Sequence, residues 1–220
     1  MSLRAKRSNL TQIKLPLPQL KSKVSLEEVI ARRRSIRKYR TEPLTLSQLS
    51  QILWSAQGIT AEGELRAAPS AGATYPLEIF AFVGKEGVSY EPEAKQPKEE
   101  LQPGIYHYEV SSHSLLLHQP GDLRKELARA ALDQGFIANA PVDIVICALY
   151  PRTSYRYGRR GERYVHVEVG HVGENIHLQA VALGLATVEV GAFDDEEVRK
   201  VLGVEDQIKP LYIMPIGKPR

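Results

Sequence analysis

Apolar residues recur at helical spacing in two segments of the chain. The first segment begins at Thr45, a residue type that caps helices, and ends near Gly58. Its apolar positions are Leu46, Leu49, Ile52, Leu53 and Ala56. In the second segment the apolar residues recur at spacings of four and three and are Val165, Val169, Val172, Ile176, Ala180 and Leu183. These spacings predict two helices with one apolar face each, and the longer runs from about Tyr164 to Leu185.

Three shorter helices are indicated by their ends. Ser25, with Glu28 three residues later, has the spacing of a capping box and predicts a helix over residues 26–34. The stretch LRKELARAAL (123–132) predicts a second short helix. The stretch DDEEVRKVLG, which Gly203 closes, predicts the third.

Strands are predicted where apolar and aromatic residues run together between turn residues. The stretches are LEIFAFVG (77–84), GIYHYEV (104–110), SLLLHQP (114–120), VDIVICALY (142–150), TVEV (187–190) and PLYIMPIG (210–217). The second and third stretches flank the polar turn Ser111-Ser112, which predicts a hairpin. Because helices and strands are mixed along the chain without strict alternation, the sequence favours an α+β fold.

The remaining stretches are predicted to be connections. Residues 1–24 are basic and contain Pro16 and Pro18, and we expect an extended N-terminal arm that lies on its own domain or on a partner subunit. Residues 84–103 and 151–163 are charged or basic and are predicted to be surface loops. Residues 25–220 are then long enough for one domain.

Composition narrows the classes of function. The 220 residues include 29 Lys and Arg against 26 Asp and Glu, and a net charge of +3 is too small to indicate nucleic-acid binding. Cys147 is the single cysteine and lies in an apolar run, so we expect a buried, inert thiol and no internal disulfide. The chain has neither the apolar core of a secretory signal nor an apolar stretch of membrane-spanning length. These features predict a cytoplasmic protein with no membrane partner.

Several site motifs are missing from the sequence. No G-x-G-x-x-G follows a strand, and neither a P-loop nor a G-x-S-x-G motif is present. Two Glu-x-x-His pairs, Glu168 with His171 and Glu174 with His177, have the spacing of metal ligands in helix bundles. The pairs are six residues apart, which turns a helix by about 240°. They therefore point to different sides, and we expect no metal site.

The segment ARRRSIRKYR (31–40) is dense in cations. Arg33, Arg34, Ser35 and Arg37 fall where the first predicted helix ends, so these arginines can simply complement the helix dipole. The alternative is an anion site, because a guanidinium binds phosphate bidentately and a serine hydroxyl adds a donor.

Two further stretches favour the anion site. Lys218 and Arg220 place two more cations directly after the final predicted strand. The turn APSAGATYP (68–76) has almost no bulky side chain before Tyr75, which lets the backbone approach a flat ligand closely. The same turn is also explained by a tight loop before a strand.

Together these stretches resemble the nitroreductase family of flavoproteins, and within it the SagB-type dehydrogenase branch. From about Pro16 onward, the matching motifs occur in the family's order. They are RRSIR (33–37), LSQILWSAQGI (49–59), RAAPSAGATYPLEIF (66–80), GIYHYE (104–109), DQGFIANAPV (133–142), EVGHVGENIHLQAVALGLATVEVGAF (168–193) and MPIGKPR (214–220). The resemblance implies a central, mostly antiparallel sheet flanked by helices, and a homodimer that binds FMN at its subunit interface.

The resemblance also implies which residues hold the FMN. The residues expected at its phosphate and ribityl chain are Arg33, Arg34, Ser35, Arg37, Lys218 and Arg220. Those expected to line the flavin ring from the other subunit are Pro69, Ser70, Ala71 and Gly72. Gln134 is expected to hydrogen-bond the pyrimidine edge of the ring. Val190, Gly191 and Ala192 are expected along the ring, with a backbone N–H of Gly191 or Ala192 facing flavin N5.

For the reaction, the resemblance implies that NADH or NADPH gives a hydride to flavin N5. The flavin then passes it to a small oxidised acceptor, such as a nitro compound, a quinone or a heterocycle. Exchange of both partners at one site predicts ping-pong kinetics. Tyr157 is the side chain expected to act in catalysis, since family members that oxidise azolines carry a Lys-Tyr pair where this chain has Arg156-Tyr157.

Two alternatives stay open. Arginine stays protonated and transfers protons poorly, so Arg156 favours a non-catalytic flavin-binding module or a partner subunit of a peptide-modifying azoline dehydrogenase system. Nucleic-acid binding by the basic arm and residues 152–163 is the weaker alternative. That surface lacks aromatic residues interleaved on a basic face, beyond Tyr155, Tyr157 and Tyr164.

Overall fold

The part of the chain that the computed structural model describes, residues 12–91 and 100–220, is centred on a seven-stranded sheet. Its strand order is β1-β8-β7-β5-β9-β11-β10, and all neighbouring strands are antiparallel. The strands are β1 (Gln12–Lys14), β5 (Leu77–Val83), β7 (Gly104–Glu109), β8 (Ser114–Pro120), β9 (Val142–Ala148), β10 (Ala186–Thr187) and β11 (Lys209–Gly217). Two short ladders accompany it: β2 (Leu44–Thr45) with β6 (Val88–Ser89), and β3 (Ile59–Ala61) with β4 (Leu65–Arg66).

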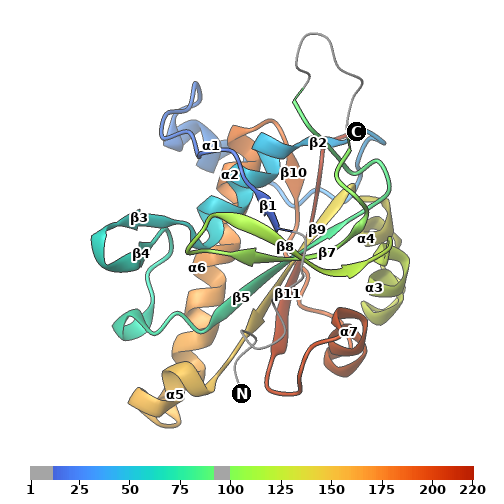
Figure 1. The fold of residues 1–220 in the computed structure, drawn as a ribbon. Coiled ribbons are helices and arrows are strands. Elements are labelled where there is room, and N and C mark those ends of the chain that lie inside the picture. The colour runs from blue at the N-terminus through green and yellow to red at the C-terminus, as the bar shows by residue number, and fades with distance from the viewer. Residues whose placement is uncertain (1–11, 92–99) are drawn as a thin grey trace.

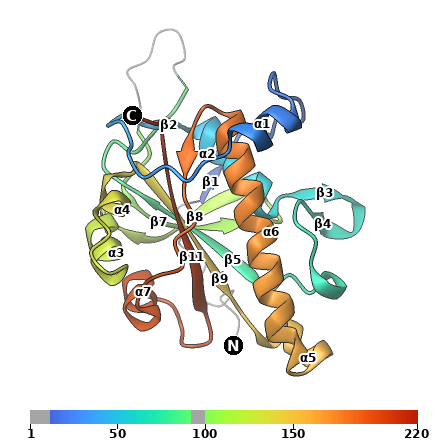
Figure 2. The ribbon, with the colours of Figure 1, turned by 180° about the vertical axis from the view of Figure 1, so that it is seen from behind.

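Helices cover both faces of this sheet (Figure 1, Figure 2). One face packs against α2 (Leu46–Gln57) and α6 (Arg160–Ala182). The other packs against α3 (Arg124–Ala130), α4 (Gly135–Asn139) and α7 (Asp195–Leu202). The remaining helices, α1 (Leu26–Arg32) and α5 (Pro151–Tyr157), both contact α6. The α+β fold and the mostly antiparallel sheet predicted from the sequence are confirmed.

The central strands are apolar on both sides because each side meets a different core. In β5, Ile79 and Ala81 face α2 and α6, while Phe80 and Phe82 face α3 and α7. Alternation of side chains along a strand produces this division. It explains why the sequence of β5 and β9 is almost continuously apolar. Cys147 lies buried in β9, and burial raises the pKa of its thiol, as expected for an inert residue.

Two of the predicted caps are present. The Thr45 hydroxyl accepts a hydrogen bond from the N–H of Gln48 at 3.1 Å, and the Gln48 side chain accepts one from the N–H of Thr45 at 3.0 Å. At α1 the Ser25 hydroxyl accepts a hydrogen bond from the N–H of Glu28 at 3.2 Å. Glu28 uses its carboxylate for an ion pair with Arg32, one turn along the helix.

The prediction of a loop over residues 151–163 is wrong. Pro151 opens helix α5, and α6 begins at Arg160. Proline suits the first turn of a helix, where its missing N–H is not needed. Only Thr153 of α5 is buried, so the segment has no apolar stripe that could reveal a helix. The strand predicted over 187–190 is also shorter than expected, because β10 ends at Thr187 and only an isolated bridge joins Val190 to Ile213.

The predicted N-terminal arm is described only in part, because residues 1–11 lie outside the described ranges. From Gln12 onward the arm adds strand β1 to the edge of the sheet, beside β8. Leu15 is buried, and the Ser50 hydroxyl of α2 donates to the carbonyl of Pro16 at 2.6 Å. These contacts hold the described part of the arm on its own domain.

Candidate functional site

The basic segment after α1 lies beside the last residues of the chain. Tyr39 and Pro219 form an antiparallel bridge. The N–H of Arg40 donates to the carbonyl of Lys218 at 2.9 Å, and the N–H of Arg220 donates to that of Lys38 at 3.1 Å. Two segments that are about 180 positions apart in the sequence are therefore joined by backbone hydrogen bonds.

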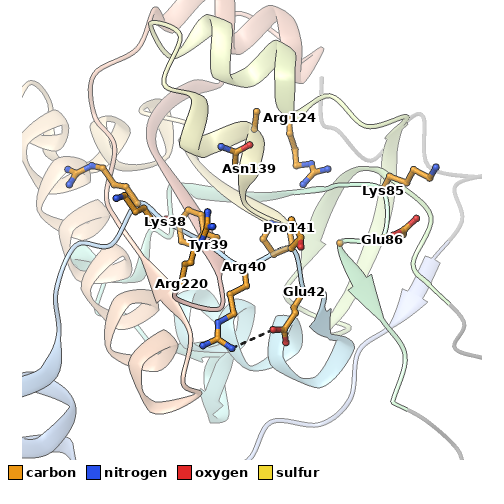
Figure 3. Close-up of a pocket in the computed structure, with 14 residues that line it drawn as sticks. Lys38, Tyr39, Arg40, Glu42, Lys85, Glu86, Arg124, Asn139, Pro141 and Arg220 are labelled. Carbon is orange, nitrogen blue, oxygen red and sulfur yellow. Dashed lines mark ion pairs between the residues drawn. The ribbon is translucent and has the colours of Figure 1, made fainter.

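A cavity of about 820 Å³ opens at this junction (Figure 3). The cations that line it are Arg37, Lys38, Arg40, Lys85, Arg124 and Arg220, and two carboxylates, Glu42 and Glu86, accompany them. Arg124 is bound by both oxygens of Asp122, at 2.6 and 2.8 Å. In contrast, Arg37 and Arg220 have no carboxylate within 4.0 Å among the residues described. A pair of unneutralised guanidinium groups at one cavity favours an anionic ligand.

Lys218 is already paired. Its ammonium lies 2.7 Å from a carboxylate oxygen of Glu42, which is itself 3.7 Å from Arg40. The hydrogen bond from Lys218 and its charge lower the pKa of Glu42. Glu42 lines the cavity and Lys218 does not, so the ammonium lies beside the cavity and is held there by Glu42.

Arg34 and Ser35 differ in their surroundings. The Arg34 guanidinium folds back and donates to the carbonyls of Arg33 at 2.6 Å and Ala31 at 3.3 Å. Arg34 thus satisfies carbonyls at the end of α1, the plainer of the two roles that the sequence left open. The Ser35 side chain is exposed, and its hydroxyl has no hydrogen-bond partner in residues 12–91 and 100–220.

The turn predicted to line the flavin ring is a tight, left-handed bend. Ala71–Ala73 form a single 3₁₀ turn in which Gly72 has φ 58° and Ala73 has φ 52°. The Ser70 hydroxyl accepts a hydrogen bond from the N–H of Tyr75 at 3.0 Å and holds the bend closed. Gly72 is exposed and presents backbone rather than side chain, as close approach to a flat ligand requires.

Helix α5 lies against this turn. Arg156 donates to the carbonyl of Gly72 at 3.2 Å, and a Cβ atom added at Gly72 would lie 2.5 Å from the Tyr157 hydroxyl. The structure therefore brings Tyr157, the predicted catalytic residue, to the turn that is predicted to line the ring. No pattern in the sequence indicates helix α5, which positions Tyr157.

A partly buried ionic cluster fixes α5 on the sheet. Glu78 of β5 contacts His107 at 2.5 Å through one oxygen and Arg152 at 2.5 Å through the other. Arg152 also donates to the carbonyl of Tyr75 at 3.0 Å. Burial opposes ionisation of Glu78, but the hydrogen bonds and charges of His107 and Arg152 outweigh it and lower its pKa to about 2. The cluster lines a second cavity, of about 630 Å³, and no motif in the sequence indicates it.

The third predicted segment, Val190 to Ala192, is also positioned by a side chain. The Gln134 amide nitrogen donates to the carbonyls of Ala192 at 2.8 Å and Ala131 at 2.9 Å. Both amide hydrogens are used in this way, which leaves only the Gln134 carbonyl oxygen for a ligand. Gly191 and Ala192 are exposed.

The chain brings two of these segments together and leaves the third apart. The N–H of Ile36 donates to the carbonyl of Thr187 at 3.0 Å, so residues 33–37 lie close to 190–192. The turn at Gly72 and Tyr157 lies with α5 near the start of α6, and the chain end lies to one side, about level with the other end of α6 (Figure 1, Figure 2). The stretch leading into this turn contacts α6 at Asn175, whose side-chain amide donates to the carbonyl of Ala67 at 3.4 Å, and the basic segment contacts α6 at His177. Two residues turn a helix by about 200°, so the two segments contact different sides of α6.

A model of the nitroreductase family matches residues 30–218. The chain belongs to the nitroreductase family. MJ1384 of Methanocaldococcus jannaschii, a candidate nitroreductase, is 45% identical over 206 residues, which cover 94% of this chain and 96% of MJ1384. The microcin B17-processing protein McbC of Escherichia coli is 24% identical over 181 residues, or 79% of this chain and 62% of McbC. These relatives confirm the resemblance to nitroreductases and to the SagB-type branch.

Solved nitroreductase structures share the fold. The crystal structure of a candidate nitroreductase from Ralstonia eutropha superposes with a TM-score of 0.79 at 25% identity, covering 95% of this chain and 90% of that one. The NADPH:FMN oxidoreductase of Vibrio harveyi, solved with NAD+, gives a TM-score of 0.59 at 21% identity, covering 88% and 68%. The second likeness is one of fold alone. No helix in the described ranges is both long and apolar enough to cross a membrane.

Proposed function

We propose that this nitroreductase-family protein is an FMN-dependent oxidoreductase that uses NADH or NADPH to reduce a small oxidised compound. The observation that carries the proposal is the junction of the basic segment with the chain end. There, Arg37 and Arg220 line one cavity without a carboxylate partner in the described residues. Their guanidinium groups suit the phosphate of FMN.

The other predicted segments fit the ring of the same cofactor. Gly72, Gly191 and Ala192 are exposed and carry no bulky side chain, so they leave room for a flat ring. When bound, FMN supplies a ring that accepts a hydride from NADH or NADPH and gives it to a second compound. Gln134 holds the carbonyl of Ala192 through its amide nitrogen, and its oxygen is the atom left to accept a hydrogen bond from the ring. Tyr157 is the side chain we expect to supply a proton to the acceptor.

The site is proposed to form between two copies of the chain. Residues 33–37 and 218–220 of one copy would hold the phosphate, and residues 69–72 of the other would line the ring. The contact of these segments with different sides of α6 within one chain supports this arrangement. Closed two-fold dimers are the commonest symmetric oligomers.

Spectroscopy of the purified protein tests this function. The protein should be yellow, or become so with added FMN, and NADH or NADPH should bleach it in the absence of oxygen. Nitro compounds, quinones and azoline heterocycles should then be tried as acceptors, with ping-pong kinetics expected for the one that restores the colour. A colourless protein that does not bind added FMN would refute the proposal.

A second candidate function is a non-catalytic flavin-binding module, or a partner subunit of a peptide-modifying azoline dehydrogenase system. Arg156 favours it, because this side chain is engaged with the Gly72 carbonyl and stays protonated. The likeness to a microcin-processing protein is also in its favour. FMN that binds but is never reduced by either nucleotide would support this function over the first.

A further inference from the structure

His177 lies buried in α6 between two of the predicted cofactor segments. Only 1% of its surface is exposed. Its Nδ1 lies 2.6 Å from a carboxylate oxygen of Glu189, and its Nε2 lies 3.2 Å from the backbone carbonyl oxygen of Arg34. Both ring nitrogens therefore face oxygen acceptors.

The ring lies between a side-chain oxygen and a backbone oxygen. A neutral imidazole carries one N–H and donates to one of the two, and an imidazole with a proton on each nitrogen donates to both. In either form the ring lies within hydrogen-bond distance of the Glu189 carboxylate and the Arg34 carbonyl. Burial opposes ionisation of Glu189, but the hydrogen bond from His177 and the charges of His177 and Arg33 outweigh it and lower the pKa of Glu189.

Through these two contacts, His177 connects two segments of the predicted FMN site. Arg34 belongs to the basic segment. A second hydrogen bond, from the N–H of Ile36 to the carbonyl of Thr187, holds the same segment. Glu189 directly precedes Val190, the first residue of the segment predicted along the ring. His177 thus contacts one residue of the basic segment and the residue directly before Val190, from a buried position in the C-terminal part of α6.

We propose that His177 and Glu189 are positioning residues that hold the backbone of residues 33–37 in the arrangement that binds a phosphate group. The proposal rests on the proposed function, in which that phosphate belongs to FMN. Neither side chain contacts the phosphate in this scheme. They act through the Arg34 carbonyl, and a ligand without a phosphate should bind equally well in their absence.

The competing explanation is a divalent metal ion. Glu174 is exposed one turn before His177, and the three possible ligand atoms of Glu174, His177 and Glu189 lie within 4.8 Å of one another. Two ligands at tetrahedral zinc are roughly 3.3 Å apart, since each bond is about 2.0–2.1 Å. The distance of 2.6 Å between His177 and Glu189 is that of a hydrogen bond. The geometry therefore favours the direct pair.

Two measurements on His177→Gln test the proposal. Without any flavin, hydrogen exchange of the amides in residues 35–37 should accelerate at least fivefold. The Kd for FMN should rise about tenfold, while the Kd for riboflavin, which lacks the phosphate, stays within twofold. The matched control is His171→Gln, which changes an exposed histidine on the same helix and should alter neither quantity. Glu189→Gln, which keeps the shape of the side chain, serves as a second variant if His177→Gln does not fold.

Other results would contradict the positioning role of His177 or the proposed function. Unchanged exchange in residues 35–37, or equal losses of FMN and riboflavin affinity, would overturn the positioning role. So would uptake of one Zn2+ per chain by EDTA-treated protein, if Glu174→Gln and His177→Gln both abolish it. If the wild-type protein binds neither flavin, the proposed function fails, and the exchange measurement still decides whether His177 holds the segment.

Discussion

The guanidinium group of Arg156 donates a hydrogen bond to the backbone carbonyl of Gly72 across 3.2 Å. This contact places the end of a short helix against the turn expected to line a flavin ring, and Tyr157 lies beside it. Tyr157, the proposed proton donor, therefore directly follows Arg156, the residue that is hydrogen-bonded to the turn. The turn and the helix should respond together to mutation.

Gly72→Ala should destabilise the protein more than a substitution at a comparable glycine. A left-handed φ costs a residue with a Cβ about 1–2 kcal/mol, and at Gly72 the new methyl group would also meet the Tyr157 hydroxyl at 2.5 Å. Gly63 is the matched control, because its φ is 73° and a Cβ there has no atom within 4 Å. Urea unfolding should show the larger loss for Gly72→Ala. Equal losses would mean that α5 does not restrain the turn.

Glu42→Gln should strengthen FMN binding. The substitution removes the carboxylate that pairs with Lys218 and leaves this ammonium free for the phosphate. We expect a several-fold lower Kd at low ionic strength and a smaller gain at high salt, because the site is partly exposed. Glu205→Gln is the control: it removes the same charge near the opposite end of β11. Fluorescence titration of FMN measures both, and a weaker or unchanged affinity for Glu42→Gln alone would contradict the prediction.

Tyr157→Phe should slow the second half of the reaction and leave the first intact. Loss of a positioned proton donor typically costs 10²–10⁴-fold in rate. Stopped-flow measurement should therefore show normal bleaching by NADH or NADPH and reoxidation by the acceptor that is about 10²-fold slower. If both half-reactions keep the wild-type rates, Tyr157 has no catalytic role.

Asp143→Asn should change how stability depends on pH. Asp143 lies in β9 with no exposed surface, and neither carboxylate oxygen has a hydrogen-bond partner in the described residues. Burial raises its pKa well above the ordinary value, against the opposing charge of Arg124. The folded protein therefore holds this proton more tightly than the unfolded chain, and Asp143 lowers stability increasingly as pH rises above its unfolded pKa of about 3.9.

The variant removes that contribution. The free energy of unfolding of Asp143→Asn, measured between pH 4 and pH 8, should exceed that of the wild type by the largest amount at pH 8. A constant difference across this range would show that Asp143 is not protonated in the folded state.

Much of the fold could be predicted because local signals and tertiary packing agree. Thr45 caps α2 as its sequence suggests, and the apolar spacing of α6 corresponds to the residues that it buries, such as Val165 and Ile176. Helix α5 could not be predicted, because it is held by the ion pair of Arg152 with Glu78, a residue 74 positions away. Such a contact leaves no periodic trace in the helix itself.

The candidate site likewise has parts that the sequence predicts and parts that it does not. The motifs predicted that Arg37 and Arg220 would meet, and backbone bonds join their segments. The partners of Lys218 and Gln134 depend on which side chains the fold brings near, and neither Glu42 nor Ala192 is close to them in the sequence. The sequence predicts that the two Glu-x-x-His pairs of α6 point to different sides and share no metal, and it does not indicate that Glu189, which follows the end of the helix, lies beside His177.

The contact of the basic segment and of the stretch before the Gly72 turn with different sides of α6 has one more consequence if the site is shared between two copies. A chain with Arg37→Ala lacks its phosphate grip, and a chain with Tyr157→Phe lacks its proton donor, but each damages a different half of the pocket. When the two variant chains are mixed and refolded together, every hybrid pair should contain one site with both residues intact, and the activity should exceed that of either variant alone.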